Sequence, residues 1–308
     1  MPQIRLAADL PGPVAYVLAG GATFGATQVG HVRALGETDL RPDFVVGTPV
    51  GSLNGAVVAE DPEAAPARLT ELWSEVTKQQ IFGTALNHAV NVATRKPSVV
   101  PNDGLRAFIE KALAARDFAD LQLPHTAMAT DFDTGRAVAI DEGDLVTALL
   151  ASAAIPLVFP EVDRGGRRLV DGGLVANVPI SVAAGLGAQT IVVMDCGFTL
   201  MPPEKDGTYT DRLLRTAAIM ASQQVRRDLE SVTDRTVLYL PGPWPLKIRP
   251  DDFRSSTEIA DKTFGMTMAW LHALEPQGPG RYGAAPTDRL TKSEPLPLPD
   301  PHERIPDH

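Results

Sequence analysis

The sequence predicts an α/β fold, in which helices cover a mostly parallel sheet. Short runs of β-branched and apolar residues alternate with longer segments of helical periodicity, and glycine-rich turns follow the first two apolar runs. Alternation of this kind places helices against a parallel sheet. The chain has 308 residues, 44% of them hydrophobic, which is enough for one large domain with a sizeable buried core.

Two strand–turn–helix units are expected near the start of the chain. A strand over residues 14–19 leads through a glycine-rich turn into a helix over 26–35, whose Val29, Val32 and Leu35 share one face. A second strand over 43–47 leads through a sharp turn into a helix of small residues over 50–59. Small residues allow that helix to pack tightly on the sheet.

The rest of the chain continues this pattern after an irregular helical insertion over about 62–115, which is long enough to cover a site and for which Asn102 is a plausible helix N-cap. We expect strands over 126–130, 136–140, 190–194 and 237–240, and helices over 145–154, 211–232 and 253–274. Residues 276–308 contain eight prolines, a composition that alone favours disorder. We therefore predict one domain over about 10–275 and a proline-rich tail.

Charge and composition narrow the choice of partner. A formal charge of −10 argues against nucleic acid and against general attraction to anionic lipid, because both carry the same sign. No stretch approaches the roughly 20 apolar residues of a transmembrane helix, and the N-terminus lacks the features of a secretion signal. The single cysteine, Cys196, cannot form an intramolecular disulfide. We expect a cytoplasmic protein.

Two segments lie where strands are expected to run into helices. Gly20, Gly21, Ala22 and Thr23 follow the first strand, where free N–H groups at a helix start can bind an anion and form an oxyanion hole. Such a loop can equally be a tight turn that needs glycine only for its backbone angles. The second segment, residues 47–51, reads Gly-Thr-Pro-Val-Gly and has the setting of the nucleophile elbow G-x-S-x-G.

Proline occupies the central position of this elbow. A nucleophile elbow raises its central side chain above the turn through a strained backbone conformation. Pro49 has no hydroxyl, and its ring holds φ near about −65°. We therefore expect that the nucleophile is lost and that the turn has relaxed.

A third segment places Asp171 after a strand and before Gly172 and Gly173. A carboxylate there can orient or deprotonate a hydroxyl group. The alternative is a local turn in which the carboxylate only accepts hydrogen bonds from nearby backbone.

Taken together, these segments resemble the patatin-like phospholipase family over roughly residues 14–198. The family's glycine-rich loop, elbow, A-S-x-A-x-P segment and D-G-G motif are matched in order by residues 20–22, 47–51, 151–156 and 171–173. The resemblance implies a three-layer α/β/α fold and descent from hydrolases that cleave lipid acyl esters with a serine–aspartate dyad. It also implies an aspartate of the dyad at Asp171, a nucleophile position at Pro49, and oxyanion or substrate contacts at Gly20, Gly21, Ala22, Thr23 and Val50.

This chain departs from the family pattern at two positions. Ala22 stands where the family prefers a third glycine, and it keeps a usable N–H if its φ stays negative. Pro49 removes the nucleophile, a loss that usually costs several orders of magnitude in rate. Thr48 or Ser52 could replace the nucleophile only in a rebuilt elbow.

The remaining reactive side chains carry weaker signals. His31 follows the oxyanion loop and is either a catalytic base or, as its expected helix favours, a core histidine. His88, His125 and Cys196 lack partners at metal-ligand spacing, so we expect neither a metal nor another cofactor.

Three functions remain open. The first is a repurposed enzyme that uses Asp171 as acid or base, with the Gly20 and Gly21 amides stabilising an oxyanion or enolate of an apolar or acyl-type substrate. The second is an inactive protein that binds a lipid or acyl ligand. The third is a lipid acyl hydrolase in which Pro49 has replaced the serine.

The missing hydroxyl leads to a direct prediction. We expect the purified protein to form no covalent adduct with a fluorophosphonate probe, which intact-mass spectrometry will show. A stoichiometric adduct on Thr48 or Ser52 would contradict this. If the turn has relaxed as expected, Pro49→Ser alone should restore little esterase activity.

Overall fold

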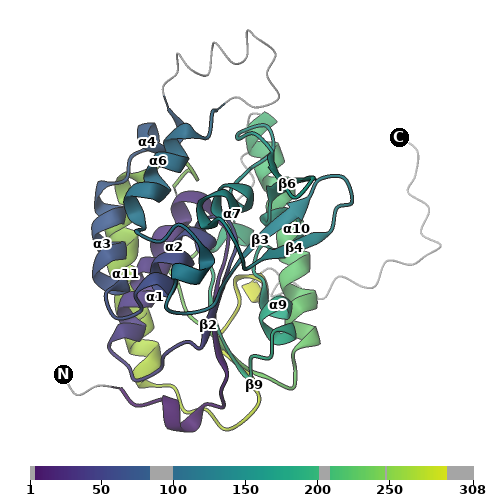
Figure 1. Ribbon diagram of the computed structural model, residues 1–308. Coiled ribbons are helices and arrows are strands. Elements are labelled where there is room, and N and C mark those ends of the chain that lie inside the picture. The colour runs from purple at the N-terminus through teal and green to yellow at the C-terminus, as the bar shows by residue number, and fades with distance from the viewer. Residues whose placement is uncertain (1–3, 84–99, 201–208, 247, 290–308) are drawn as a thin grey trace, which may run out of the picture.

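The computed structural model describes residues 4–83, 100–200, 209–246 and 248–289 (Figure 1). Over these residues the chain forms one mixed sheet with strand order β5-β6-β3-β2-β1-β7-β8-β9, and β4 pairs with β3 beside this order. The strands are β1 (Val14–Leu18), β2 (Phe44–Gly47), β3 (His125–Asp131), β4 (Ala137–Ile140), β5 (Val162–Arg164), β6 (Arg167–Asp171), β7 (Thr190–Met194), β8 (Thr236–Tyr239) and β9 (Gly280–Tyr282).

The centre of the sheet is parallel and buried on both faces. Strands β3, β2, β1, β7, β8 and β9 pair in parallel, whereas β4 and β6 run antiparallel to β3, and β5 antiparallel to β6. Every residue of β1 and β7 is buried. Strands covered on both faces lack polar alternation, which explains their continuous apolar runs. The predicted α/β class and mostly parallel sheet are confirmed.

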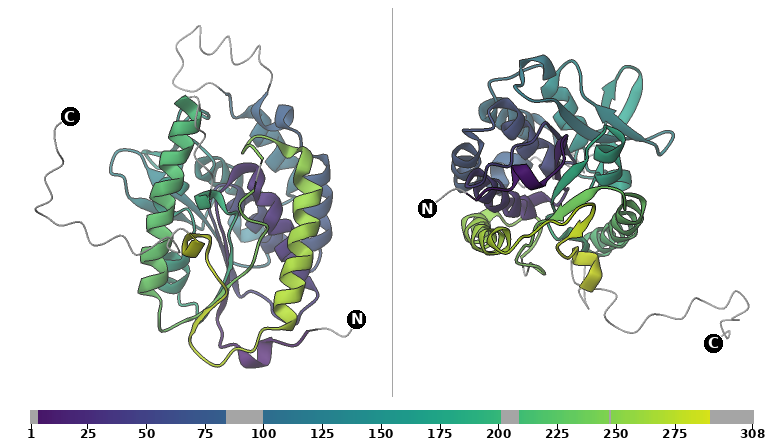
Figure 2. Two further views of the ribbon diagram at one scale, coloured as in Figure 1. Left: turned by 180° about the vertical axis from the view of Figure 1, so that it is seen from behind. Right: turned by 90° about the horizontal axis from the view of Figure 1, so that it is seen from below.

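Helices form a layer on each side of this sheet (Figures 1 and 2). Helices α1, α2, α3 and α11 share one hydrophobic cluster, and α9 and α10 share a second cluster on the other face. The helices are α1 (Ala26–Gly36), α2 (Val50–Glu60), α3 (Ala65–Glu75), α4 (Lys78–Phe82), α6 (Asp103–Ala112), α7 (Leu145–Ser152), α8 (Gly173–Ala176), α9 (Ile180–Gly185), α10 (Tyr209–Ser231) and α11 (Ser256–His272). The expected three-layer α/β/α arrangement is therefore present.

Close backbone packing brings the first two strand ends together. A side chain at Gly51 would overlap the carbonyl oxygen of Leu18, and one at Gly47 would overlap the carbonyl oxygen of Gly51. The start of α2 therefore lies directly against the end of β1. This contact sets the turn at Pro49 beside the loop that begins at Gly20.

The insertion and the tail are only partly as expected. The insertion forms α3, α4 and α6, with residues 84–99 outside the described chain. Asn102 precedes α6, but its side chain makes no capping hydrogen bond.

The sheet extends beyond the predicted domain boundary at 275, where β9 pairs with β8. The short edge hairpin of β5 and β6 was also not foreseen in full, since β5 has only three residues. None of the helices in the described ranges is long and apolar enough to cross a membrane.

Candidate functional site

A cavity of about 200 Å³ opens where the loops after β1 and β2 meet. Its walls are mostly apolar, and its polar side chains are Asn54, Asp171 and Asn177. The apolar walls include Leu53, Trp73, Val76, Ile81, Phe82, Leu105, Phe108, Ile155, Phe159, Leu174, Phe198, Leu214 and Phe253. The helical insertion thus forms one wall, as its expected position over a site suggested.

The elbow keeps its sharp strand–turn–helix path around Pro49. Gly51 donates its N–H to the Thr48 carbonyl oxygen at 2.7 Å, and Ser52 donates to the Pro49 carbonyl oxygen at 3.0 Å. Pro49 has φ 8° and ψ −94°, away from the usual proline region. The expectation of a relaxed turn is therefore wrong. Tight packing of Gly47 and Gly51 fixes the turn, whatever side chain stands between them.

The predicted oxyanion loop, residues 20–23, has two amides that donate to backbone carbonyl oxygens and two that have no acceptor among the described residues. Gly20 donates its N–H to the Asn177 carbonyl oxygen at 2.9 Å, and Thr23 donates to the Pro250 carbonyl oxygen at 3.2 Å. Within the described chain, the amides of Gly21, Ala22 and Val50 have no protein acceptor. All three of these residues line the cavity, which makes their amides the candidates for binding a negatively charged oxygen.

Ala22 does not have the negative φ that was expected from the sequence. Its φ is +50°, in the left-handed region, and its N–H nevertheless has no protein acceptor among the described residues. An alanine there costs about 1–2 kcal/mol relative to the right-handed region, because its Cβ crowds the following carbonyl oxygen. The loop therefore keeps the backbone path that suits glycine and carries the cost of the alanine.

Asp171 closes the cavity from the end of β6. Its N–H donates to the Ala154 carbonyl oxygen at 3.0 Å, and its own carbonyl oxygen accepts from the Thr130 hydroxyl at 2.8 Å. The Oδ1 atom accepts the Gly173 N–H at 2.6 Å. Desolvation by the surrounding walls raises the pKa of Asp171 to about 7, against a smaller lowering by the Gly173 hydrogen bond. A carboxyl with this pKa can take up or release a proton near neutrality.

Asn177 joins the loop, the elbow and Asp171 into one cluster. A Cβ built on Gly20 would lie 2.5 Å from Asn177 Oδ1 and 3.1 Å from Pro49 Cδ. A Cβ built on Gly173 would lie 3.0 Å from both Asn177 Oδ1 and Asp171 Oδ1. The structure therefore brings together the residues expected at the oxyanion hole, the elbow and the dyad.

Comparison with known proteins agrees with this geometry. A family model described as patatin-like phospholipase matches residues 16–184, more than half of the chain. The chain belongs to the patatin-like phospholipase family. Every motif of the cluster lies inside the matched range, whereas α10, α11, β8 and β9 lie beyond it.

Relatives with similar sequences include much longer proteins. Patatin-like phospholipase domain-containing protein 7 of Mus musculus is 30% identical over 197 residues, which is 63% of this chain and 14% of that protein. Patatin-like phospholipase domain-containing protein 6 of Homo sapiens is 29% identical over 213 residues, which is 68% of this chain and 15% of that protein. This chain thus spans about a seventh of these relatives.

Two further matches come from bacteria. An uncharacterized NTE family protein of Mycobacterium tuberculosis is 30% identical over 231 residues, 70% of this chain and 59% of that protein. The crystal structure of VipD from Legionella pneumophila aligns with a TM-score of 0.41 and 11% identity, over 87% of this chain and 69% of that chain.

The remaining predicted residues of this patatin-like chain lie outside the cavity. His31 is fully buried, with Nε2 3.0 Å from the Pro241 carbonyl oxygen, and burial lowers its pKa to about 4. Its position fits a neutral core histidine. Thr48 and Ser52 are buried and donate their hydroxyls to the carbonyl oxygens of Ala176 and Pro49, at 2.6 and 2.8 Å. Neither residue lines the cavity.

The other candidate side chains, Cys196, His125 and His88, lack metal partners at ligand spacing in the sequence. Cys196 is buried, and burial raises the pKa of its thiol well above the ordinary value. His125 is buried under α2, and His88 lies outside the described residues. No group of three or more His, Cys, Asp or Glu side chains able to hold a metal occurs in the described ranges.

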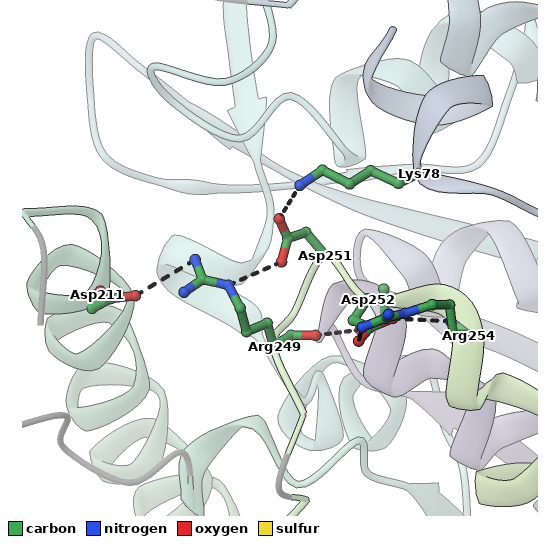
Figure 3. A network of polar contacts seen from close by, with 7 residues as sticks. Lys78, Asp211, Arg249, Asp251, Asp252 and Arg254 are labelled. Atoms are coloured by element: carbon green, nitrogen blue, oxygen red, sulfur yellow. Dashed lines mark hydrogen bonds and ion pairs between the residues drawn. The ribbon is translucent and has the colours of Figure 1, made fainter. Parts of the chain in front are cut away.

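Sequence reasoning missed the segment over residues 249–254, whose ion pairs Figure 3 shows. Residues 249–254 place Pro250 and Phe253 on the cavity wall, while the Arg249 carbonyl oxygen accepts the Thr23 hydroxyl at 3.2 Å. Arg249 pairs with Asp211 of α10 at 3.8 Å, and Lys78 of α4 pairs with Asp251. The ion pairs are partly exposed and individually weak. Together they connect the segment to both sides of the site.

Asn54, Trp73 and Asn177 were also missed as site residues. Asn177 stands six residues after Asp171, within a segment that was already singled out. Its Nδ2 atom is buried without a partner in the described structure. Asn54 lies one helical turn after Val50, and both residues line the cavity, so helical spacing from the elbow would have indicated it.

The raised pKa of Asp171 predicts how stability depends on pH. The unfolded chain releases this proton near the ordinary value of 3.8, whereas the folded protein holds it to about 7. The stabilising contribution is therefore complete below about pH 4 and is lost as pH rises through about 7. We expect Asp171→Asn to flatten the fall of Tm over this window in differential scanning fluorimetry.

The matched control for this measurement is Asp133→Asn. Asp133 is an exposed aspartate of the β3–β4 turn that pairs with Arg168. The Asp133→Asn variant should show the same fall of Tm between about pH 4 and 7 as the wild type. Equal slopes for the wild type and Asp171→Asn would show that Asp171 titrates normally.

Proposed function

We propose that this chain carries out non-covalent acid–base chemistry on an apolar, acyl-type substrate. The observation that supports this most strongly is the pairing of Asp171, with its pKa of about 7, with the free amides of Gly21 and Ala22 around one apolar cavity. A proton acceptor and an oxyanion site are the two elements that such chemistry needs. A serine nucleophile is not required.

The lining of the cavity supports an acyl chain as the bound group. Aromatic and aliphatic side chains from α3, α4 and α6 face the space beside Pro49. Burying an alkyl chain against them gains roughly 25 cal/mol per Å² of apolar surface. The relatives named as phospholipases support a lipid or another acyl ester as the source of such a chain.

The proposed step keeps its atoms and charges balanced. Ionised Asp171 accepts a proton from a water molecule whose oxygen bonds to the acyl carbonyl carbon. The carbonyl oxygen then carries the negative charge and accepts hydrogen bonds from the Gly21 and Ala22 amides. The carbonyl re-forms as the ester carbon–oxygen bond breaks, and Asp171 gives the proton to the leaving oxygen, which restores the carboxylate.

Asp171→Asn tests this proposal, because it keeps the shape of the side chain and removes the base. A library of esters and lipids is first screened by mass spectrometry for a substrate that is turned over. We expect the variant to fold and to lose about a hundredfold or more in rate. The wild-type rate should rise with pH through about 7, as the base form of Asp171 appears.

The exposed variant Asp133→Asn again serves as the control and should keep the wild-type rate. An unchanged rate in folded Asp171→Asn would remove the acid–base proposal. Its failure would favour a ligand-binding protein without turnover. The hydroxyls of Thr48 and Ser52, both committed to backbone carbonyl oxygens, favour that second function.

The retained turn changes the expected outcome of restoring the nucleophile. Because the backbone around residue 49 already follows the elbow path, Pro49→Ser should place a hydroxyl at the tip of the turn. We expect this variant to form a covalent fluorophosphonate adduct on the introduced serine, detected by peptide mapping. Pro49→Ala should form none, and adding Asp171→Asn should slow labelling. An unlabelled, folded Pro49→Ser protein would show that the elbow is not held as described.

A further inference from the structure

Three buried side chains form a continuous hydrogen-bonded chain behind the site. Trp73 of α3 donates its indole Nε1–H to Asn54 Oδ1 at 2.9 Å, and Asn54 Nδ2 donates to Gln28 Oε1 at 2.8 Å. Gln28 Nε2 then donates to the Ala19 carbonyl oxygen at 2.8 Å and to the Met194 carbonyl oxygen at 3.2 Å. Gln28 is fully buried, and Asn54 and Trp73 are 4% and 8% exposed.

The chemistry of its two ends fixes the direction of this chain. An indole can only donate, so Asn54 must present its oxygen to Trp73. Backbone carbonyl groups can only accept, so Gln28 must present its nitrogen to Ala19 and Met194. Asn54 and Gln28 consequently have one satisfactory amide orientation each. Reversing either amide would leave buried donors facing donors.

The hydrogen-bonded side chains contact both ends of the loop that follows β1. The Ala19 carbonyl oxygen accepts from Gln28, while the N–H of the same peptide unit, at Gly20, donates to the Asn177 carbonyl oxygen at 2.9 Å. This peptide plane is therefore held on both sides. At the other end of the loop, Asn54 Nδ2 also donates to the Gly25 carbonyl oxygen at 3.3 Å. The free amides of Gly21 and Ala22 lie between these two anchors.

The opposite end of the chain forms part of the cavity wall. Trp73 and Asn54 both line the cavity, and the Trp73 ring lies 6.2 Å from the Phe253 ring, centroid to centroid. A Cβ built on Gly25 would lie 3.0 Å from Trp73 Cζ2. The indole therefore touches the end of the loop as well as the space that an acyl chain would fill.

We infer that Trp73, Asn54 and Gln28 are positioning residues that couple the apolar wall of the cavity to the oxyanion amides. An acyl chain that packs against Trp73 restrains the indole ring. The hydrogen bonds from Trp73 through Asn54 to Gln28 transmit this restraint to the peptide groups that orient Gly21 and Ala22. None of the three side chains needs to contact the reacting atoms. The inference rests on the proposed function for its catalytic meaning, but its structural content can be tested without turnover.

The test uses Trp73→Phe, which keeps an aromatic ring and removes the N–H. Sodium decanoate serves as the probe, and the Gly21 and Ala22 amides are followed by ¹H–¹⁵N NMR. We expect decanoate affinity to change by less than about threefold, since the apolar contact remains, while the amide shifts on binding fall by more than about half. Where a substrate is turned over, kcat should fall about tenfold and KM should stay within about twofold.

Two further variants keep the test decisive. Asn54→Asp still accepts from Trp73 but cannot donate to Gln28 or Gly25, and it should reproduce the loss of the amide shifts without changing the ring. Trp270→Phe removes a partly buried tryptophan of α11 that does not line the cavity, and it should leave the shifts as in the wild type.

Wild-type amide shifts in both Trp73→Phe and Asn54→Asp would overturn the coupling. An equal loss in Trp270→Phe would overturn it as well, because the effect would then be general. Failure of the proposed function has a different signature. In that case Asp171→Asn would leave turnover unchanged, while the Trp73→Phe shifts would still differ from those of the wild type.

Discussion

The site depends on the approach of two backbones at the end of β1. The start of α2 packs so closely on Leu18 that Gly51 has no room for a side chain, and Gly47 is equally confined against Gly51. This contact places the turn at Pro49 next to Gly20 and brings both loops to the carboxyl edge of parallel strands. Once it is made, the direction of α2 is set, and with it the position of Asn54 beneath the loop.

That close packing explains why the turn keeps the backbone path of a nucleophile elbow although proline occupies its central position. The turn is determined by what packs around it, namely two glycines, a strand end and a helix start. The side chain at the tip contributes chemistry rather than shape. The same reasoning applies to Ala22, which adopts a left-handed conformation because β1 and α1 fix the ends of its loop. In both places, local preference is overridden by the tertiary contacts on either side.

Much of this could be predicted from the sequence. The apolar runs at β1 and β7 and the helical spacing of Val29, Val32 and Leu35 predicted the class and the central elements. Strands buried on both faces read as continuous apolar runs, and helices that pack on a sheet repeat apolar residues at helical spacing. Gly20, Gly21, Pro49 and Asp171 were grouped from the family resemblance, and all four line one cavity. The loops at Gly20 and Pro49 meet because β1 and β2 are parallel neighbours whose carboxyl ends share one edge, whereas Asp171 reaches the cavity from β6, which runs antiparallel to β3. The pairing of β9 was missed because three residues are too few to show a period.

Other features of the site correspond to no pattern in the sequence. The desolvation that raises the pKa of Asp171 comes from walls distant in sequence, and no local pattern reports it. Trp73 looks like an ordinary core anchor until its N–H is seen to meet Asn54. The assumption that proline imposes its own φ failed for a related reason, since it treated residue 49 in isolation from the glycines that confine its neighbours.

The segment over residues 249–254 contributes to the site from the C-terminal half of the chain, whereas the recognised motifs lie closer to the N-terminus. It lies beyond the range that the family model matches, yet its carbonyl groups accept from Thr23 and its Phe253 packs against Trp73. A fragment ended at residue 184 would contain every recognisable motif but would lack this segment, together with β7, the parallel neighbour of β1. The range that the family model matches and the folded sheet therefore do not coincide, and transplanting this site into another scaffold requires residues beyond 184 as well.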